Sequence, residues 1–131
     1  MTAHFILYVA DQKASARFYE RALGLKPRLD VPGMTEFELG AQCVLGLMPS
    51  AGIKRLLGER LPDPAGAAGV PRAELYLLVE DPGASHRRAL DGGARELSPL
   101  SARDWGHEAA YSLDLDGHVL AFARPMTAPG H

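Results

Sequence analysis

The spacing of apolar residues near the start of the chain changes at Asp11, from a continuous run to a helical repeat. Residues 5–9 form an apolar run of strand length that ends just before Asp11. Apolar residues then recur at helical spacing from Ala14 to Leu23, and Gly24 follows. The pattern predicts a strand, a helix that Asp11 caps at its amino end, and a helix end at Gly24.

The same order of segments returns in the second half of the chain. VADQKAS at residues 9–15 is echoed by VEDPGAS at 79–85, an offset of 70 residues. VLGL at 44–47 is echoed by VLAF at 119–122, and each of these runs precedes a proline. Such self-similarity indicates a repeated structural unit. The chain is therefore expected to be a duplication whose second copy opens with a strand at 75–79.

The second copy also carries signals that begin and end a helix. Asp81 is placed to cap it, and Pro82 suits the first helical position because its missing N–H costs nothing there. Gly92 and Gly93 are placed to end it, as Gly24 does in the first copy. The remaining strands are expected at residues 26–31, 35–39, 44–48, 94–97, 108–114 and 119–123. Each copy is thus a βαβββ unit of an α+β fold.

We expect one domain that spans residues 1–131. Its first module covers about 1–49, a linker covers 50–72, and its second module covers about 73–125. The linker is longer than most loops of a compact domain, and it predicts one short helix near 53–57 before a segment rich in Pro, Gly and Ala. The tail from Pro125 to His131 offers little to bury, so we expect it to be mobile.

Charge and composition remove several classes of function. The 14 basic and 16 acidic side chains give no electrostatic footprint for nucleic acid or anionic lipid. The amino terminus has a short apolar run with no basic segment before it, which fits neither a signal peptide nor a spanning helix, so we expect a cytoplasmic protein. Cys43 is the only cysteine, and its apolar neighbours predict a buried strand thiol outside any intrachain disulfide.

Two segments resemble a known superfamily. The opening VADQKASARFYERALGL and the late strand and turn DLDGHVLAF are similar to vicinal oxygen chelate proteins. These include glyoxalase I, fosfomycin-resistance enzymes, extradiol dioxygenases and bleomycin-resistance proteins. The resemblance covers residues 4 to about 125. It implies two βαβββ modules with a cupped mixed sheet, a small-molecule pocket on the concave side, and a homodimer.

The resemblance also implies where a metal would bind. Metal-dependent members place ligands on the first and last strands of each module, at positions that fall here on His4, Glu74, Gly46 and Ala121. Only His4 and Glu74 have donor side chains, whereas a firmly bound divalent ion needs at least three ligands. We therefore expect no bound metal. His107 is the residue that could supply a third ligand, if its loop folds over the pocket.

Three tyrosines are candidates for the pocket. Strand alternation puts Tyr8 on the same side of its strand as His4, and Tyr76 on the same side as Glu74. Tyr111 is expected on a neighbouring strand. Aromatic rings with a polar tip suit a planar or glycosylated small molecule, and satisfied core tyrosines explain them equally well.

The loop ARDWGHEAAY carries further candidates. Trp105 either covers a small cavity or anchors its loop in the core, and both interpretations remain open. His107 follows it at the mouth of the scaffold, where binding residues concentrate. Arg103 and Asp104 are expected to pair with each other or with backbone. His118, in the later turn DGHVL, is expected to be a turn or outer-face residue.

These observations favour a metal-free protein that sequesters a small hydrophobic or aromatic ligand. A metal-dependent lyase, isomerase or dioxygenase of the same superfamily is the alternative, and an accessory subunit without a ligand is a third. No nucleophile elbow, Walker A loop or dinucleotide-binding glycine motif occurs in the sequence. The expected ligand-binding residues are His4, Tyr8, Gly46, Glu74, Tyr76, Trp105, His107, Tyr111 and Ala121.

Overall fold

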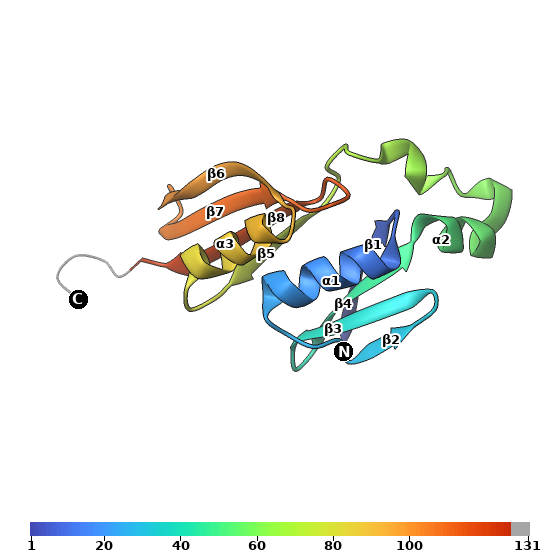
Figure 1. Cartoon of the computed structure of the whole chain (residues 1–131), viewed down its shortest axis with the longest axis horizontal. Helices are drawn as coiled ribbons and strands as arrows, with labels where there is room; N and C mark the ends of the chain where they lie inside the picture. The colour runs from blue at the N-terminus through green and yellow to red at the C-terminus, as the bar shows by residue number, and fades with distance from the viewer. Residues whose placement is uncertain (127–131) are drawn as a thin grey trace. The chain divides into compact units, whose positions relative to one another are not determined.

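Each copy of the repeat forms a four-stranded sheet of its own in the computed structural model, which describes residues 1–126 (Figure 1). Contacts divide the chain into a first unit, Met1–Ala68, and a second unit that begins at Gly69. Most of the expected linker therefore belongs to the first unit. No helix among residues 1–126 is long and apolar enough to cross a membrane.

The elements follow the predicted order. The first unit contains β1 (Ala3–Val9), α1 (Gln12–Leu23), β2 (Leu29–Val31), β3 (Met34–Gly40), β4 (Cys43–Pro49), α2 (Ser50–Leu57) and two 3-10 turns, η1 (Gly58–Arg60) and η2 (Pro64–Ala67). The second unit contains β5 (Glu74–Leu78), α3 (Pro82–Asp91), β6 (Arg95–Ala102), β7 (His107–Leu113) and β8 (Val119–Pro125). The predicted α+β class and the two βαβββ modules are confirmed.

Both sheets have the same topology. Their strand orders are β1-β4-β3-β2 and β5-β8-β7-β6, so the last strand of each module pairs with the first. This pair is parallel and the others are antiparallel, which makes each sheet mixed. The helical crossover between the parallel strands lies along one face of its own sheet (Figure 1). The duplication read from the sequence is therefore a duplication of structure.

The predicted helix caps are present in both modules. The carboxylate of Asp11 accepts a hydrogen bond from the N–H of Ala14 at 3.0 Å, and that of Asp81 accepts one from Ala84 at 3.1 Å. These bonds satisfy N–H groups that have no partner within the helix. Gly24 ends α1 with a left-handed φ of 68°, a conformation that glycine adopts without a steric penalty.

The helix-covered face of each sheet contains its apolar core. In the first unit this face buries Leu7, Val9, Phe37, Leu45 and Leu47, and in the second it buries Leu120 and Phe122. Because side chains alternate along a strand, the residues between them point to the opposite face. We call this second face of each sheet, the one without the helix, the open face. The functional candidates that belong to strands lie on it.

The structure corrects three boundaries. The strand predicted at 26–31 is only Leu29–Val31, since Pro27 has no N–H to donate to a neighbour. The strand predicted at 94–97 extends to Ala102, because two irregularities in its pairing with β7 accommodate Pro99. The helix predicted near 53–57 begins earlier, at Ser50, and the two 3-10 turns that follow it were not predicted.

The structure also corrects two smaller predictions, one about Cys43 and one about Pro125. Cys43 is half-buried rather than buried, because it is the first residue of β4 and follows a turn. Pro125 is the last residue of β8, so the prediction of a mobile tail is wrong for this residue. The rest of that prediction concerns residues 127–131, which lie outside the described part of the chain.

Gly117 is expected to tolerate no side chain. Its φ is +88°, and an added Cβ would lie 2.8 Å from the Cα of Gly69, whose N–H donates to the carbonyl of Asp116. Gly117→Ala should therefore lower the free energy of unfolding by roughly 2–4 kcal/mol. Gly66→Ala is the matched control, since nothing lies within 4 Å of its added Cβ. Urea unfolding that found equal stability for the two variants would contradict the prediction.

Candidate functional site

Residues on three strands of the second sheet share a row on its open face. Tyr76 of β5 and Tyr111 of β7 both pair with Ala121 of β8, so the alanine lies between the two tyrosines. Paired residues project to the same face of a sheet. The small side chain of Ala121, which is fully buried, leaves room for a phenol ring on either side. The row is therefore a continuous aromatic surface built on regular strands.

A hydrogen-bonded network extends this surface towards the β6–β7 loop. The indole N–H of Trp105 donates to the hydroxyl oxygen of Tyr76 at 2.8 Å, and the same hydroxyl lies 2.7 Å from Nδ1 of His107. The rings of Tyr76 and His107 are nearly parallel, with an interplanar angle of 24° and a centroid distance of 5.7 Å. The phenol of Tyr76 thus connects a loop indole to a strand imidazole.

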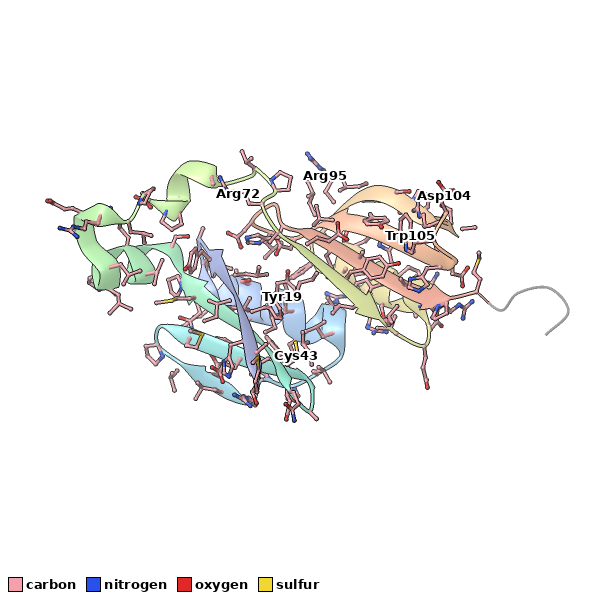
Figure 2. The ribbon with its side chains drawn as sticks, turned by 180° about the vertical axis from the view of Figure 1, so that it is seen from behind. Tyr19, Cys43, Arg72, Arg95, Asp104 and Trp105 are labelled. Atoms are coloured by element: carbon pink, nitrogen blue, oxygen red, sulfur yellow. The ribbon has the colours of Figure 1, made fainter. Side chains whose placement is uncertain are left out.

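Trp105 remains largely accessible despite this bond. It is 56% exposed and lies beside Asp104 in the β6–β7 loop (Figure 2). It therefore does not anchor its loop in the core, which was one of the two interpretations of the sequence. The structure holds an exposed indole in a fixed position by a polar bond to Tyr76.

Arg103 supports the same loop and contacts the aromatic row. Its Nε and Nη2 donate to the carbonyl of Ala109, and Nη2 also donates to the carbonyl of Pro99 and to Oγ of Ser98. Its guanidinium carbon lies 5.1 Å from the centre of the Tyr111 ring, a cation–π distance. The expectation that Arg103 pairs with backbone is confirmed.

The pKa of Tyr111 reflects these surroundings. Burial raises the pKa of its hydroxyl above the ordinary value of 10.0, and the negative charge of Glu74 and the nearby Tyr76 raise it further. The positive charge of Arg103 acts in the opposite direction. Tyr111 is therefore a protonated hydrogen-bond donor at neutral pH.

The open face of the first sheet carries an ionic cluster instead of an aromatic row. Nδ1 of His4 lies 3.5 Å from one carboxylate oxygen of Glu36, and Nε of Arg28 donates to the other at 3.0 Å. Glu36 pairs with Gly46 on the neighbouring strand, so its carboxylate lies on the face that the metal position would occupy. Sequence reasoning missed Glu36 and Arg28. Alternation along TEFEL, with Thr35 and Phe37 facing the core, would have placed Glu36 on the open face.

The residues present do not make a metal site within either unit. No three His, Cys, Asp or Glu side chains among residues 1–126 converge in a way that could hold an ion. In the first unit the guanidinium of Arg28 already neutralises Glu36. A Cβ on Gly46 would lie 3.0 Å from Cγ1 of Ile6 and 3.1 Å from Sδ of Met34, so apolar atoms fill the space where a ligand side chain would stand.

The structure brings together only part of the predicted set. Tyr76, Trp105 and His107 are in direct contact, whereas His4, Tyr8 and Gly46 belong to the first unit. Tyr8 shares the open face of β1 with His4 and is 38% exposed. Glu74 begins β5, one row from the tyrosines.

His118 lies in the turn between β7 and β8, as predicted. Its Nδ1 lies 3.0 Å from Oδ2 of Asp114, and Oδ1 of this buried carboxylate accepts the N–H groups of Asp116 and His118. The hydrogen bond to Asp114 raises the pKa of His118 above 6.5; burial partly opposes this, and the charges of Asp114 and Asp116 add to the increase. This histidine stabilises a turn, and nothing places it in the aromatic site.

Comparison with known proteins identifies relatives of the whole chain. The family model described as the glyoxalase/bleomycin resistance protein/dioxygenase superfamily matches residues 2–122. No curated protein matches the chain in sequence. A glyoxalase-related enzyme from Fulvimarina pelagi has a similar structure, with a TM-score of 0.79 and 24% identity over 100% of this chain and 95% of the other.

Two further solved structures are similar over nearly their whole length. One is a glyoxalase/bleomycin resistance protein/dioxygenase from Nocardioides, with a TM-score of 0.76 and 20% identity over 100% of this chain and 88% of the other. Another is an enzyme of the same family from Burkholderia phytofirmans PsJN, with a TM-score of 0.75 and 14% identity over 94% and 97%. At these identities the likeness shows the fold alone.

The ion pair of His118 predicts a pH dependence of stability. The pKa of His118 in the folded protein is raised above its unfolded value near 6.5. The stability that the His118–Asp114 ion pair contributes is therefore fully present below pH 6.5, and it is lost as the pH rises through the folded pKa. His118→Gln keeps a hydrogen-bond donor but does not titrate. Thermal unfolding between pH 6 and 9 should show a loss of stability in the native chain that this variant lacks. Parallel curves for the two proteins would contradict the assignment.

Proposed function

The chain belongs to the glyoxalase/bleomycin resistance protein/dioxygenase superfamily, and we propose that it is a metal-free binding protein for a small aromatic or hydrophobic compound. The observation that carries the proposal is the network of Tyr76, Trp105 and His107 on the open face of the second sheet. Large aromatic side chains with a few convergent polar groups are typical of small-molecule sites. A fixed, exposed indole supplies contact area at little entropic cost.

The scaffold supports a preformed site. Tyr76, Tyr111 and His107 stand on strands of one sheet, and the loop that carries Trp105 is closed by a 2.7 Å bond from the N–H of Arg103 to the carbonyl of His107. Side chains on regular strands are held more firmly than side chains on free loops. Stacking against a planar ligand then requires little rearrangement of the protein.

The donor set supports binding without metal. Of the positions that the superfamily uses for metal, Gly46 and Ala121 have no donor atom, and Arg28 competes with any cation for Glu36. A divalent ion bound to His4 alone would have weak affinity, since each missing ligand removes charge attraction and fixed geometry. Ligand sequestration asks for no Lewis acid, whereas the metal-dependent lyase or dioxygenase alternative does.

We also retain the homodimer as a proposal. Strands β1 and β5 are edges of their sheets and carry exposed apolar residues, with Phe5 and Leu78 each 59% exposed. Exposed sheet edges favour association with a further strand, and most homo-oligomers are closed dimers. Light scattering that finds a monomer at micromolar concentration would contradict this proposal.

Trp105 is the only tryptophan, so its signals report on the site alone. Titration with 2-naphthamide should shift the indole N–H resonance and change the fluorescence of Trp105. Tyr76→Phe removes the hydroxyl that holds both Trp105 and His107, and it should weaken binding about tenfold, the effect of roughly one lost orienting hydrogen bond.

Lys26→Gln is the control, because Lys26 lies in the first unit and, among residues 1–126, forms an ion pair with Glu20 alone. It should leave the affinity for 2-naphthamide unchanged. An indole resonance that no aromatic probe moves, at millimolar concentration and in a folded protein, would rule out the aromatic site.

Metal analysis tests the proposal that the protein binds its ligand without a metal ion. Protein purified without chelator should contain far less than one zinc, nickel or manganese ion per chain, because neither unit offers three convergent donors among its described residues. Added divalent ions should leave the melting temperature unchanged, and so should prior treatment with chelator. A stoichiometric ion whose loss accompanies His4→Ala would instead restore the metal-dependent enzyme.

A further inference from the structure

Arg103 has hydrogen-bonding capacity that the fold does not use. Its Nε and Nη2 are occupied by carbonyl oxygens and a serine hydroxyl, while its Nη1 has no hydrogen-bond partner within residues 1–126. No carboxylate in this described part of the chain forms an ion pair with it, including the neighbouring Asp104. The guanidinium is thus fixed by three backbone or hydroxyl groups and still carries a full positive charge.

His107 presents a second donor in the same place. The indole N–H of Trp105 can only donate to the hydroxyl of Tyr76, and we assign the hydroxyl proton to the bond with Nδ1 of His107. In this assignment the imidazole proton is on Nε2. Nε2 has no partner among residues 1–126, so it remains a free N–H donor next to the aromatic surface.

Charged and polar groups surround the tyrosine row on the open face of the second sheet. The guanidinium of Arg103 lies over the ring of Tyr111, on the β6 side of the row. His107 lies at the loop end of this face, and the carboxylate of Glu74 belongs to its opposite end. His107 and the row of Glu74 are separated by six residues along β7, about 20 Å in an extended strand. The tyrosine row lies between His107 and the row of Glu74.

Resting on the binding function proposed above, we propose that the ligand is an aromatic carboxylate, whose ring lies on Tyr76 and Trp105 and whose anionic group is recognised by Arg103 and His107. A carboxylate accepts a charge-assisted hydrogen bond from the free Nη1 group of Arg103 better than a neutral acceptor does. Pairing with Nη1 needs no rearrangement of the loop, because the bonds of Nε and Nη2 already orient the guanidinium. Arg103 is then the residue that sets specificity for charge.

Three probes of the same shape test the proposal. The affinities of 2-naphthoate, 2-naphthamide and (2-naphthylmethyl)ammonium are measured from the indole N–H resonance of Trp105. We expect 2-naphthoate to bind about tenfold more tightly than the amide, in line with a charge-assisted hydrogen bond, and the ammonium to bind most weakly. Equal affinity for 2-naphthoate and 2-naphthamide would overturn the carboxylate assignment and leave the aromatic site intact. Failure of all three probes would overturn the proposed function itself.

Variants separate recognition from loop structure. Arg103→Gln removes loop bonds as well as the positive charge, so it should lower the affinity for 2-naphthoate about tenfold more than the affinity for 2-naphthamide. If Arg103 only supports the loop, both affinities fall equally, and the proposal is wrong. Arg103→Lys should retain part of the preference for the carboxylate, because it keeps the charge without the planar fork. Lys26→Gln removes a comparable positive charge in the first unit and should change none of the three affinities.

Discussion

The covering of one face of each sheet by its own helix is the constraint on which the remaining structure depends. Once α1 or α3 packs on one face, every second side chain of each strand is committed to the core and the others to the open face. The register of the parallel pair between first and last strand then decides which open-face residues are neighbours. A shift of one residue would exchange Tyr76 with Leu77 and remove the aromatic row.

The two modules share this scaffold and differ in what the open face carries. In the first, Glu36 lies between His4 and Arg28, and the ion pair leaves no net charge for a ligand cation to use. In the second, the aromatic row ends at the free N–H groups of Arg103 and His107. The two modules thus share the caps and the sheet topology, which stability requires, while their open faces carry different chemistry.

Repetition made most of the fold predictable from the sequence. The caps at Asp11 and Asp81 and the strand order depend on local signals that occur twice, and both copies agree with the structure. The length of β6 was not predictable, because Pro99 resembles a strand end and is accommodated only by irregular pairing with β7. A local sequence pattern indicates the secondary structure that a segment favours by itself. It does not indicate which irregularities a neighbouring strand can accommodate in the pairing.

The candidate site was predictable residue by residue but not as a network. Alternation identified Tyr76, and the loop composition identified Trp105 and His107. Their connection through a single hydroxyl depends on a turn whose glycine, Gly106, has a φ of +85°. Glu36 was not predicted, because the superfamily resemblance implies a ligand position at Gly46, its partner across the sheet, and none at Glu36 itself.

The two positions without metal donors are closely packed on their open faces. At Gly46 the space beside the central strand is occupied by Ile6 and Met34. At Ala121 the flanking tyrosines leave the residue fully buried. Both places are packed with apolar or aromatic side chains and lack the polar groups that a divalent ion needs. Such a surface offers dispersion contacts to a planar organic molecule. A carboxylate introduced at either position would therefore have to displace the packing on the open face of its own sheet.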